Sequence, residues 1–283
     1  MDETTSALIN LALEEDIGPG DVTSQYFVPE DREARALIVA KADGVIAGVE
    51  VAAEVFRRVD PSIKVKILLE DGSWVSPRAY VLEVIGKARS LLTAERVALN
   101  FLQRMSGVAT KTRQFVELMD GTSARILDTR KTTPGWRALE KAAVVAGGGM
   151  NHRMGLYDRA MVKDNHLVAE GGIAALQDAI HRLKKEKAGV EIELEADRLD
   201  QVEAFLKLEG VDYILLDNMD NESLAQAVEM RAGSGPLLEA SGGVTLSTVA
   251  AIARTGVDFI SVGAITHSAV ALDLSLEFVE HEA

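Results

Sequence analysis

The residues best suited to chemistry lie close together between Asp128 and His166. This segment holds seven Lys and Arg residues against four Asp and Glu residues, in a chain whose formal net charge is -14. It also contains two of the five histidines and the run Gly147–Gly149. Cations gathered beside glycines, in an acidic protein, indicate a site for a polyanionic ligand. The segment opens with DTRKTTPG, which is poor helix sequence, so a solvated surface helix explains the charges less well.

These residues must be positioned by an alternation of strands and helices in the second half of the chain. Helical patterns follow most of the apolar runs of strand length, which span residues 124–127, 160–162, 190–194, 213–216, 236–238 and 259–262. Such repetition predicts a parallel sheet in a small or incomplete α/β barrel, with an open doubly wound sheet as the alternative. In a barrel the carboxyl ends of all strands meet on one face, so residues distant in sequence become neighbours.

The first hundred residues have a different, mixed pattern. Short β-rich runs separated by turn residues predict a small α+β unit, with a helix over Val49–Val59. A long helical stretch follows over Thr93–Met119, and Ser106-Gly107 predicts a break within it.

Basic side chains follow the first two strands of the predicted barrel. Arginine binds carboxylates and phosphates through its two-pronged fork, and lysine binds them as a point charge. His152 and His166 lie in the same segment, but no third ligand is near, so we expect no tight transition-metal site. The cations that we expect to bind the ligand are Arg130, Lys131, Arg153 and Lys163.

Two carboxylates, Glu195 and Asp217, end successive strands of the predicted barrel. Mg²⁺ is commonly held by one or two carboxylates together with substrate phosphates and water, so these residues predict a magnesium site or a site for substrate hydroxyls. For Glu193 the alternation along its strand leaves two possibilities open, a place in the barrel interior or a structural partner.

Two glycine-containing loops follow the last two strands of the predicted barrel. The first is Ser241-Gly242-Gly243 and the second is Ser261-Val262-Gly263. Glycine allows backbone N–H groups to approach an anion, and a following helix would add a partial positive charge. We therefore predict that these loops bind a phosphate.

Composition excludes several other classes of protein. The net charge of -14 opposes broad binding to nucleic acid or anionic membranes. The chain has no cysteine, which excludes thiolate metal sites and cysteine nucleophiles and fits a reducing compartment. No apolar run reaches membrane-spanning length, and the acidic amino terminus is unlike a signal peptide, so we expect a cytoplasmic protein. The GxxxxGK[ST], HExxH and GxSxG motifs are absent from the sequence.

Seven segments of the chain together form a specific pattern. They are AERVALNFLQRMSGVAT (94–110), DTRKTTPG (128–135), AGGGMNHRMGL (146–156), KDNH (163–166), LLDNM (215–219), EASGG (239–243) and SVGAITHS (261–268). These motifs resemble those of the quinolinate phosphoribosyltransferase family (nicotinate-nucleotide pyrophosphorylase, carboxylating), and the similarity covers nearly the whole chain. One departure is Trp136, where the family often has leucine.

The resemblance implies an amino-terminal α/β sandwich domain and an incomplete (seven-stranded-type) α/β barrel. We expect the sandwich domain over residues 1–108 and the barrel over 109–268, with the tail 269–283 packed back on the first domain. The implied enzyme is a homodimer, or a multiple of one, that uses Mg²⁺. It transfers phosphoribose from phosphoribosyl pyrophosphate to quinolinate, and it releases pyrophosphate and CO₂ to give nicotinate mononucleotide for NAD biosynthesis.

The resemblance also implies residue roles on the acceptor side. The two quinolinate carboxylates would be surrounded by Arg130, His152, Arg153 and Lys163, with Arg96 supplied by the partner subunit.

On the donor side, the resemblance implies that Lys131 helps to hold phosphoribosyl pyrophosphate. Glu195 and Asp217 would serve the ribose hydroxyls and Mg²⁺, and the Ser241–Gly243 and Ser261–Gly263 loops would bind the 5′-phosphate. The catalytic set would then be Lys131, Lys163, Glu195 and Asp217.

Two other functions stay open on the sequence. A related type II phosphoribosyltransferase could act on another acceptor, such as nicotinate, or could be the molybdenum-transport relative. The cluster of Arg130, His152 and Arg153, joined by Arg96, favours an acceptor with two carboxylates over one with a single carboxylate. From a different class, Lys163 at a strand end could be the Schiff-base lysine of a barrel aldolase.

Overall fold

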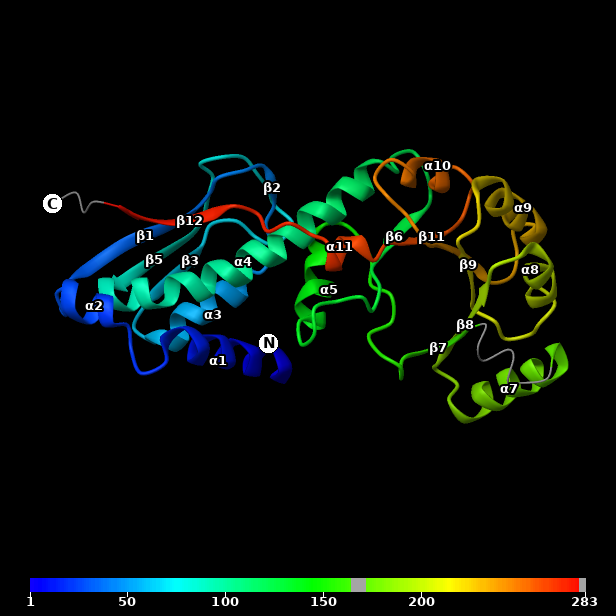
Figure 1. Ribbon diagram of the computed structural model, residues 1–283, viewed down its shortest axis with the longest axis horizontal. Coiled ribbons are helices and arrows are strands. Elements are labelled where there is room, and N and C mark those ends of the chain that lie inside the picture. The colour runs from blue at the N-terminus through cyan, green and yellow to red at the C-terminus, as the bar shows by residue number, and fades with distance from the viewer. Residues whose placement is uncertain (164–171, 280–283) are drawn as a thin grey trace. The chain divides into compact units, whose positions relative to one another are not determined.

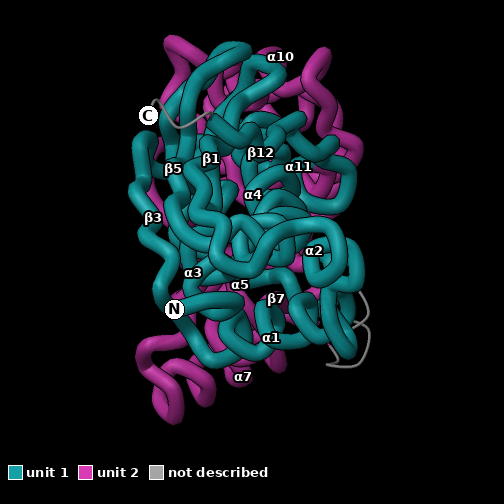
Figure 2. Tube along the Cα trace, turned by 90° about the vertical axis from the view of Figure 1, so that its left-hand side faces the viewer, with its two compact units in different colours: residues 1–113, 132–148, 265–283 teal, residues 114–131, 149–264 magenta. Residues whose placement is uncertain are grey.

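The computed structural model describes residues 1–163 and 172–279 of the 283-residue chain. They divide into two compact units, which Figure 2 shows in different colours. Unit 1 comprises residues 1–113, 132–148 and 265–283, and unit 2 comprises residues 114–131 and 149–264. Compared with the boundaries expected from the sequence, unit 1 extends to residue 113 and also includes residues 132–148.

Unit 1 is built on an antiparallel sheet with the strand order β12-β1-β5-β3 (Figure 1). Residues 36–40 of β1 are all buried, so both faces of this strand are covered. Ile38 lies opposite Leu276 of β12 and Leu82 of β5, so the end of the described chain returns to unit 1. The strands are β1 (Glu33–Ala40), β3 (Lys64–Ile67), β5 (Tyr80–Lys87) and β12 (Leu274–Val279), with a separate ladder of β2 (Gly44–Val45) and β4 (Trp74–Val75).

The helices of unit 1 start and pack as their sequences dictate. Asp2 accepts the backbone N–H of Thr5 at 2.9 Å, and this contact caps the first helix. In the third helix the face formed by Ala52, Val55 and Phe56 is fully buried. The helices are α1 (Glu3–Ile17), α2 (Val22–Phe27), α3 (Val49–Val59), α5 (Arg137–Ala146) and α11 (Ala264–His267), the last beginning one residue before unit 1 resumes.

Helix α4 (Ala88–Glu117) runs without interruption, so the break predicted at Ser106-Gly107 is wrong. Position 107 requires glycine for packing, because a Cβ there would lie 2.1 Å from the carbonyl oxygen of Val270. The hydroxyl of Ser106 is turned to the core, where it accepts the N–H of Ala47 at 3.0 Å. Although α4 has 30 residues, no helix in the described part of the chain is apolar enough to cross a membrane.

Unit 2 contains a parallel sheet in the order β6-β11-β10-β9-β8-β7, with helices between successive strands (Figure 1). All six predicted strand runs are present, and the predicted incomplete α/β barrel is confirmed. Beside β6, Leu127 also forms a single parallel bridge with Met150. The strands are β6 (Arg125–Leu127), β7 (Arg159–Val162), β8 (Glu191–Ala196), β9 (Tyr213–Asp217), β10 (Leu237–Ser241) and β11 (Phe259–Ser261). The helices are α7 (Ile173–Glu186), α8 (Leu199–Phe205), α9 (Asn221–Arg231) and α10 (Val249–Ala253).

Candidate active site

The register of the parallel sheet brings several predicted site residues to one edge. Glu195 of β8 pairs with Leu215, and Asp217 at the end of β9 pairs with Ser241 at the end of β10. Ser261 at the end of β11 pairs with Leu127, directly before the DTRK sequence. The carboxyl ends of these strands therefore meet, as the barrel pattern predicted.

The two carboxylates at this edge have partners within unit 2. The ammonium of Lys163 forms an ion pair with Glu195. Asp217 accepts a hydrogen bond from the side chain of Asn218 at 2.7 Å. Both carboxylates are partly exposed and stand on neighbouring strands, which suits a magnesium ion held mainly by substrate and water.

Two guanidinium groups lie near each other in the same unit. Burial lowers the pKa of Arg153, and the positive charge of Arg130 lowers it further. Arg153 is held in place, because it donates to the carbonyl oxygen of Arg159 at 3.0 Å and lies 3.5 Å from the sulfur of Met161. A half-buried guanidinium beside a second cation forms a site that an anion stabilises.

The DTRKTTPG sequence forms an ordered turn before α5. At its start, the N–H of Lys131 donates to the hydroxyl of Thr129 at 3.0 Å, and the Lys131 side chain is exposed. Further along, in unit 1, the buried carboxylate of Glu140 accepts the N–H of Thr133 at 3.1 Å and its hydroxyl at 2.8 Å. The same carboxylate pairs with Arg104 at 2.7 Å.

His152 is buried, and both of its ring nitrogens face protein atoms. Nε2 lies 3.2 Å from Glu193 and 3.4 Å from Glu239, and Nδ1 accepts the N–H of Arg153 at 2.7 Å. From the sequence the place of Glu193 stayed open, and Glu239 had no predicted role. Acids and apolar residues alternate along β8, so the local pattern does not mark Glu193 as buried.

The predicted phosphate loops differ from each other in what they offer. Gly242 and Gly243 have φ of 97° and 59°, a left-handed backbone that suits a loop presenting N–H groups. In the second loop the N–H of Val262 already donates to Leu127 at 2.9 Å, so it cannot serve a ligand in this arrangement. The helices after these loops, α10 and α11, have five and four residues and add less dipole than expected.

Arg96 lies on α4 in unit 1 and is exposed. Asp164, Asn165 and His166 of the KDNH motif fall outside the described residues. Trp136 is a packing residue, since its ring stacks on Phe101 with centroids 4.8 Å apart.

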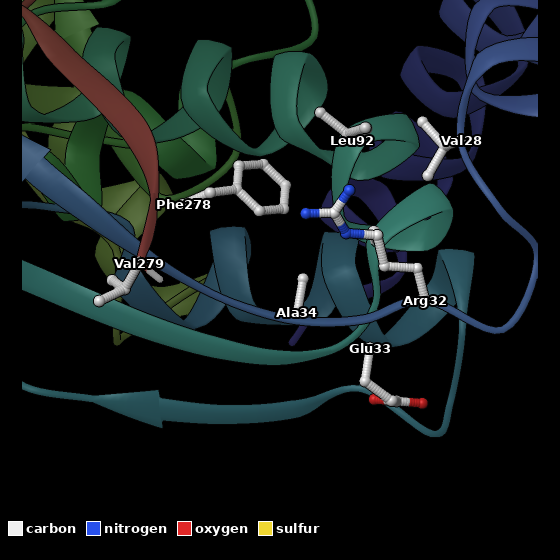
Figure 3. A pocket seen from close by; sticks show the side chains of 8 residues that line it. Val28, Arg32, Glu33, Ala34, Leu92, Phe278 and Val279 are labelled. Carbon is white, nitrogen blue, oxygen red and sulfur yellow. The ribbon is translucent and has the colours of Figure 1, made fainter. Parts of the chain in front are cut away.

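A pocket of about 510 Å³ lies within unit 1, between the start of β1, the first turns of α4 and the end of β12 (Figure 3). None of the predicted site residues lines this pocket. Its lining includes Arg32, Leu92 and Phe278. The strand-end carboxylates and the arginines of unit 2 are not among the lining residues.

Comparison with known protein families identifies the family to which the chain belongs. Residues 108–277 match the quinolinate phosphoribosyl transferase C-terminal domain, and residues 21–106 match the N-terminal domain. The chain belongs to the quinolinate phosphoribosyltransferase family. The similarity thus extends over both units.

This member of the quinolinate phosphoribosyltransferase family has relatives in both plants and bacteria. It is 45% identical to the chloroplastic carboxylating nicotinate-nucleotide pyrophosphorylase of Oryza sativa subsp. japonica, over 96% of this chain and 76% of the relative. A probable carboxylating nicotinate-nucleotide pyrophosphorylase of Synechocystis is also 45% identical, over 95% of this chain and 90% of the relative. The solved structure of the nicotinate-nucleotide pyrophosphorylase of Francisella tularensis matches with a TM-score of 0.91 and 38% identity, and the match covers 98% of this chain and 96% of that one.

Proposed function

We propose that this protein transfers phosphoribose from phosphoribosyl pyrophosphate to the ring nitrogen of quinolinate. The C–O bond between ribose and pyrophosphate breaks, and a C–N bond to the pyridine forms. CO₂ then leaves the ring carbon next to the nitrogen, the pyridinium accepts the electron pair, and that carbon takes a proton. The observation that carries the proposal is the pair of neighbouring guanidinium groups, Arg130 and Arg153, beside two strand-end carboxylates in a member of this family.

The acceptor side of the site is formed by cations. Arg130 and Arg153 bind the two carboxylates of quinolinate, because each guanidinium can grip a carboxylate through two N–H groups. Lys163 reaches the acceptor from the end of β7, and its ion pair with Glu195 holds the ammonium in place before the substrates arrive. The match of both domains of the chain to the quinolinate phosphoribosyltransferase family disfavours the aldolase alternative.

The donor side uses Lys131, the glycine loops and the two carboxylates. Lys131 is exposed and binds the pyrophosphate, and the Ser241–Gly243 and Ser261–Gly263 loops hold the 5′-phosphate. Glu195 and Asp217 face the ribose, where they stabilise the positive charge that develops as pyrophosphate leaves. Mg²⁺, when bound through these carboxylates and the substrate oxygens, would neutralise charge on the leaving pyrophosphate.

A competition assay tests this function. Quinolinate, nicotinate and nicotinamide are offered together with phosphoribosyl pyrophosphate and Mg²⁺, and CO₂ and pyrophosphate are measured. We expect equal amounts of both products from quinolinate alone, and loss of activity when the metal is chelated. Equal activity with nicotinate would contradict the argument from two carboxylates.

We further propose a C₂ homodimer in which Arg96 enters the site of the partner subunit. Each unit exposes apolar side chains that a partner would cover, such as Phe27 (82% exposed) in unit 1 and Tyr157 (77% exposed) in unit 2. Arg96→Ala and Lys163→Ala dimers should each be nearly inactive. Mixing them should restore up to about half the sites in each heterodimer, because one of its two sites has both wild-type residues. Heterodimers confirmed by native mass spectrometry but without activity would contradict supply of Arg96 in trans.

We propose the cytoplasm as the place of reaction, since the chain contains no cysteine and so fits a reducing compartment.

A further inference from the structure

An ion pair within unit 1 joins three segments of the chain that are far apart in sequence. Arg104 of α4 pairs with Glu140 of α5 at 2.7 Å, and Glu140 is fully buried. The Arg104 guanidinium also donates to the carbonyl oxygen of Thr266, in α11, at 2.6 Å and to that of Ala269 at 2.8 Å. One arginine side chain therefore holds together helices α4, α5 and α11 (Figure 1).

The carboxylate of Glu140 also binds the turn that precedes α5. Its Oε2 accepts the backbone N–H of Thr133 at 3.1 Å, and its Oε1 accepts the hydroxyl of Thr133 at 2.8 Å. The other end of the turn is fixed by Trp136, whose N–H donates to the carbonyl oxygen of Thr133 at 3.0 Å and whose ring stacks on Phe101 of α4. The ion pair thus fixes this turn against α4.

Helix α4 binds the segment after α11 at further points. The side chain of Gln103 donates to the carbonyl oxygen of Leu274 at 2.7 Å. Gly107, one turn further along the helix, leaves room for the carbonyl oxygen of Val270, which would lie 2.1 Å from a Cβ at that position. Together with the guanidinium contacts, these interactions hold residues 266–274 against α4.

Both segments that this ion pair holds are direct continuations of the proposed donor site. Thr133 follows Lys131 by two residues, and Thr266 follows the Ser261–Gly263 loop by three. In each case the chain passes from unit 2 to unit 1 between the donor residues and the held residue, after Lys131 and after Ala264. The ion pair therefore restrains both segments shortly after they leave the donor site.

An ion pair with a fully buried carboxylate is a costly way to hold helices together. Apolar side chains of similar size often stabilise a core as well or better, because they avoid the removal of charge from water. A guanidinium and a carboxylate add direction, since each binds its partners only in certain geometries. Here the partners include backbone groups of Thr133, Thr266 and Ala269, so the ion pair specifies where the backbone lies.

We propose that Arg104 and Glu140 are positioning residues for the donor half of the site, which set Lys131 and the Ser261–Gly263 loop at the spacing that phosphoribosyl pyrophosphate requires. The donor carries a phosphate on C5 and a pyrophosphate on C1 of one ribose, so the protein must meet both groups at once. This proposal deepens the proposed function, on which it rests. The two residues act through the backbone that they hold, and not by contact with a substrate.

The first experiment is hydrogen exchange, followed by mass spectrometry, on the protein without ligands. Arg104→Gln removes the guanidinium that contacts both segments. We expect exchange to become faster by about tenfold in the peptides that cover residues 129–136 and 262–271, and in both together, because each loses charge-assisted contacts. Unchanged exchange in both peptides, or a change in only one, would overturn the proposal.

The second experiment is titration calorimetry with phosphoribosyl pyrophosphate and Mg²⁺ and, separately, with quinolinate, at a temperature where each variant is folded. Arg104→Gln should weaken donor binding by about tenfold and quinolinate binding by less than about twofold. Quinolinate is spared because Arg153 is held by the carbonyl oxygen of Arg159, within unit 2. Thr133→Val removes one hydroxyl and leaves the ion pair, so it should weaken donor binding by about threefold.

Two matched control variants remove the same kinds of contact elsewhere in unit 1. Arg58→Gln removes an ion pair with Glu54 at 2.9 Å and a hydrogen bond to the carbonyl oxygen of Ser6 at 2.7 Å. Thr5→Val removes a hydroxyl that donates to the carboxylate of Asp2 at 2.7 Å. Both controls should leave the exchange of the two peptides and the affinity for both ligands unchanged.

Each remaining outcome has a distinct meaning. Unchanged donor affinity in a folded Arg104→Gln protein would overturn the proposal, and so would equal losses of donor and quinolinate binding, which a merely structural role would give. If Arg104→Gln does not fold, Thr133→Val decides by the same comparison of the two ligands. Failure of the wild type to bind phosphoribosyl pyrophosphate would contradict the proposed function, while hydrogen exchange without ligands would still decide whether the ion pair holds both segments.

Discussion

Replacing Gly242 by alanine should damage the site in a way that replacing its neighbour does not. Gly242 has φ of 97°, and a Cβ there would lie 2.1 Å from the side-chain oxygen of Asn218 and 2.9 Å from its backbone nitrogen. Gly243 has φ of 59°, and a Cβ there would have nothing within 4 Å. The pair therefore separates steric overlap from backbone strain.

The magnitudes follow from these two contacts. Alanine at Gly243 needs only a left-handed backbone, which costs about 1 kcal/mol of unfolding free energy. Alanine at Gly242 adopts a rarer conformation and must also displace Asn218, so we expect a loss of about 2 to 4 kcal/mol. Asn218 donates to Asp217 at 2.7 Å, so its displacement also moves a carboxylate of the site. The KM for phosphoribosyl pyrophosphate should rise by about tenfold in Gly242→Ala and by less than about threefold in Gly243→Ala.

Urea denaturation and steady-state kinetics measure these effects. The double variant Gly242→Ala with Asn218→Gly removes the side chain in the way and suits the φ of 55° at that residue, so part of the lost stability should return. Equal losses in Gly242→Ala and Gly243→Ala, or no recovery in the double variant, would refute the steric argument.

Three further predictions concern other parts of the molecule. Arg130→Ala or Arg153→Ala should weaken quinolinate binding by about 2 kcal/mol or more and donor binding by less, because a charge-assisted pair loses one partner; unchanged affinity by calorimetry would contradict the assignment. Glu195→Ala and Asp217→Ala should lower kcat more than they raise the KM for quinolinate, since their effect is greatest as ribose becomes cationic; unchanged kcat in both would argue against that role. Glu140→Ala should reduce the unfolding free energy by about 3 kcal/mol or more, as it leaves a buried ion pair broken, and thermal and urea unfolding that match the wild type would count against it.

The strands of the barrel could be predicted from the sequence because most contain a short apolar run, while β8 alternates acids with apolar residues, and polar residues follow the strands. The register of β8, β9 and β10 then follows from parallel pairing, and this brings Glu195, Asp217 and Ser241 together. Gly107 predicts a break in helix α4 when only the local sequence is considered, but the helix is continuous. Glycine is needed at this position because the carbonyl oxygen of Val270 lies close by, a contact across 163 positions that no local pattern encodes.

The buried acids could not be placed from sequence for a related reason. In β8 acids alternate with apolar residues, and in β10 Glu239 shares a face with the exposed Leu237, so a period of two places Glu193 and Glu239 on a polar face although both are buried. Their meaning depends on His152, which reaches them from a different part of the chain. Buried polar groups of this kind violate local rules, and sites of function are where such violations are expected.

The same acids explain how the protein keeps two cations side by side before an anion arrives. Arg130 lowers the pKa of Arg153, a repulsion that would tend to push the guanidinium groups apart. The negative charge of Glu193 acts in the opposite direction on Arg153, from the buried side of the site. Glu193 can remain ionised there because the effects of His152 and Arg159 outweigh its burial and lower its pKa. Arg153 is thus stabilised from the buried side of the site, and together with Arg130 it would select an acceptor with two carboxylates rather than one.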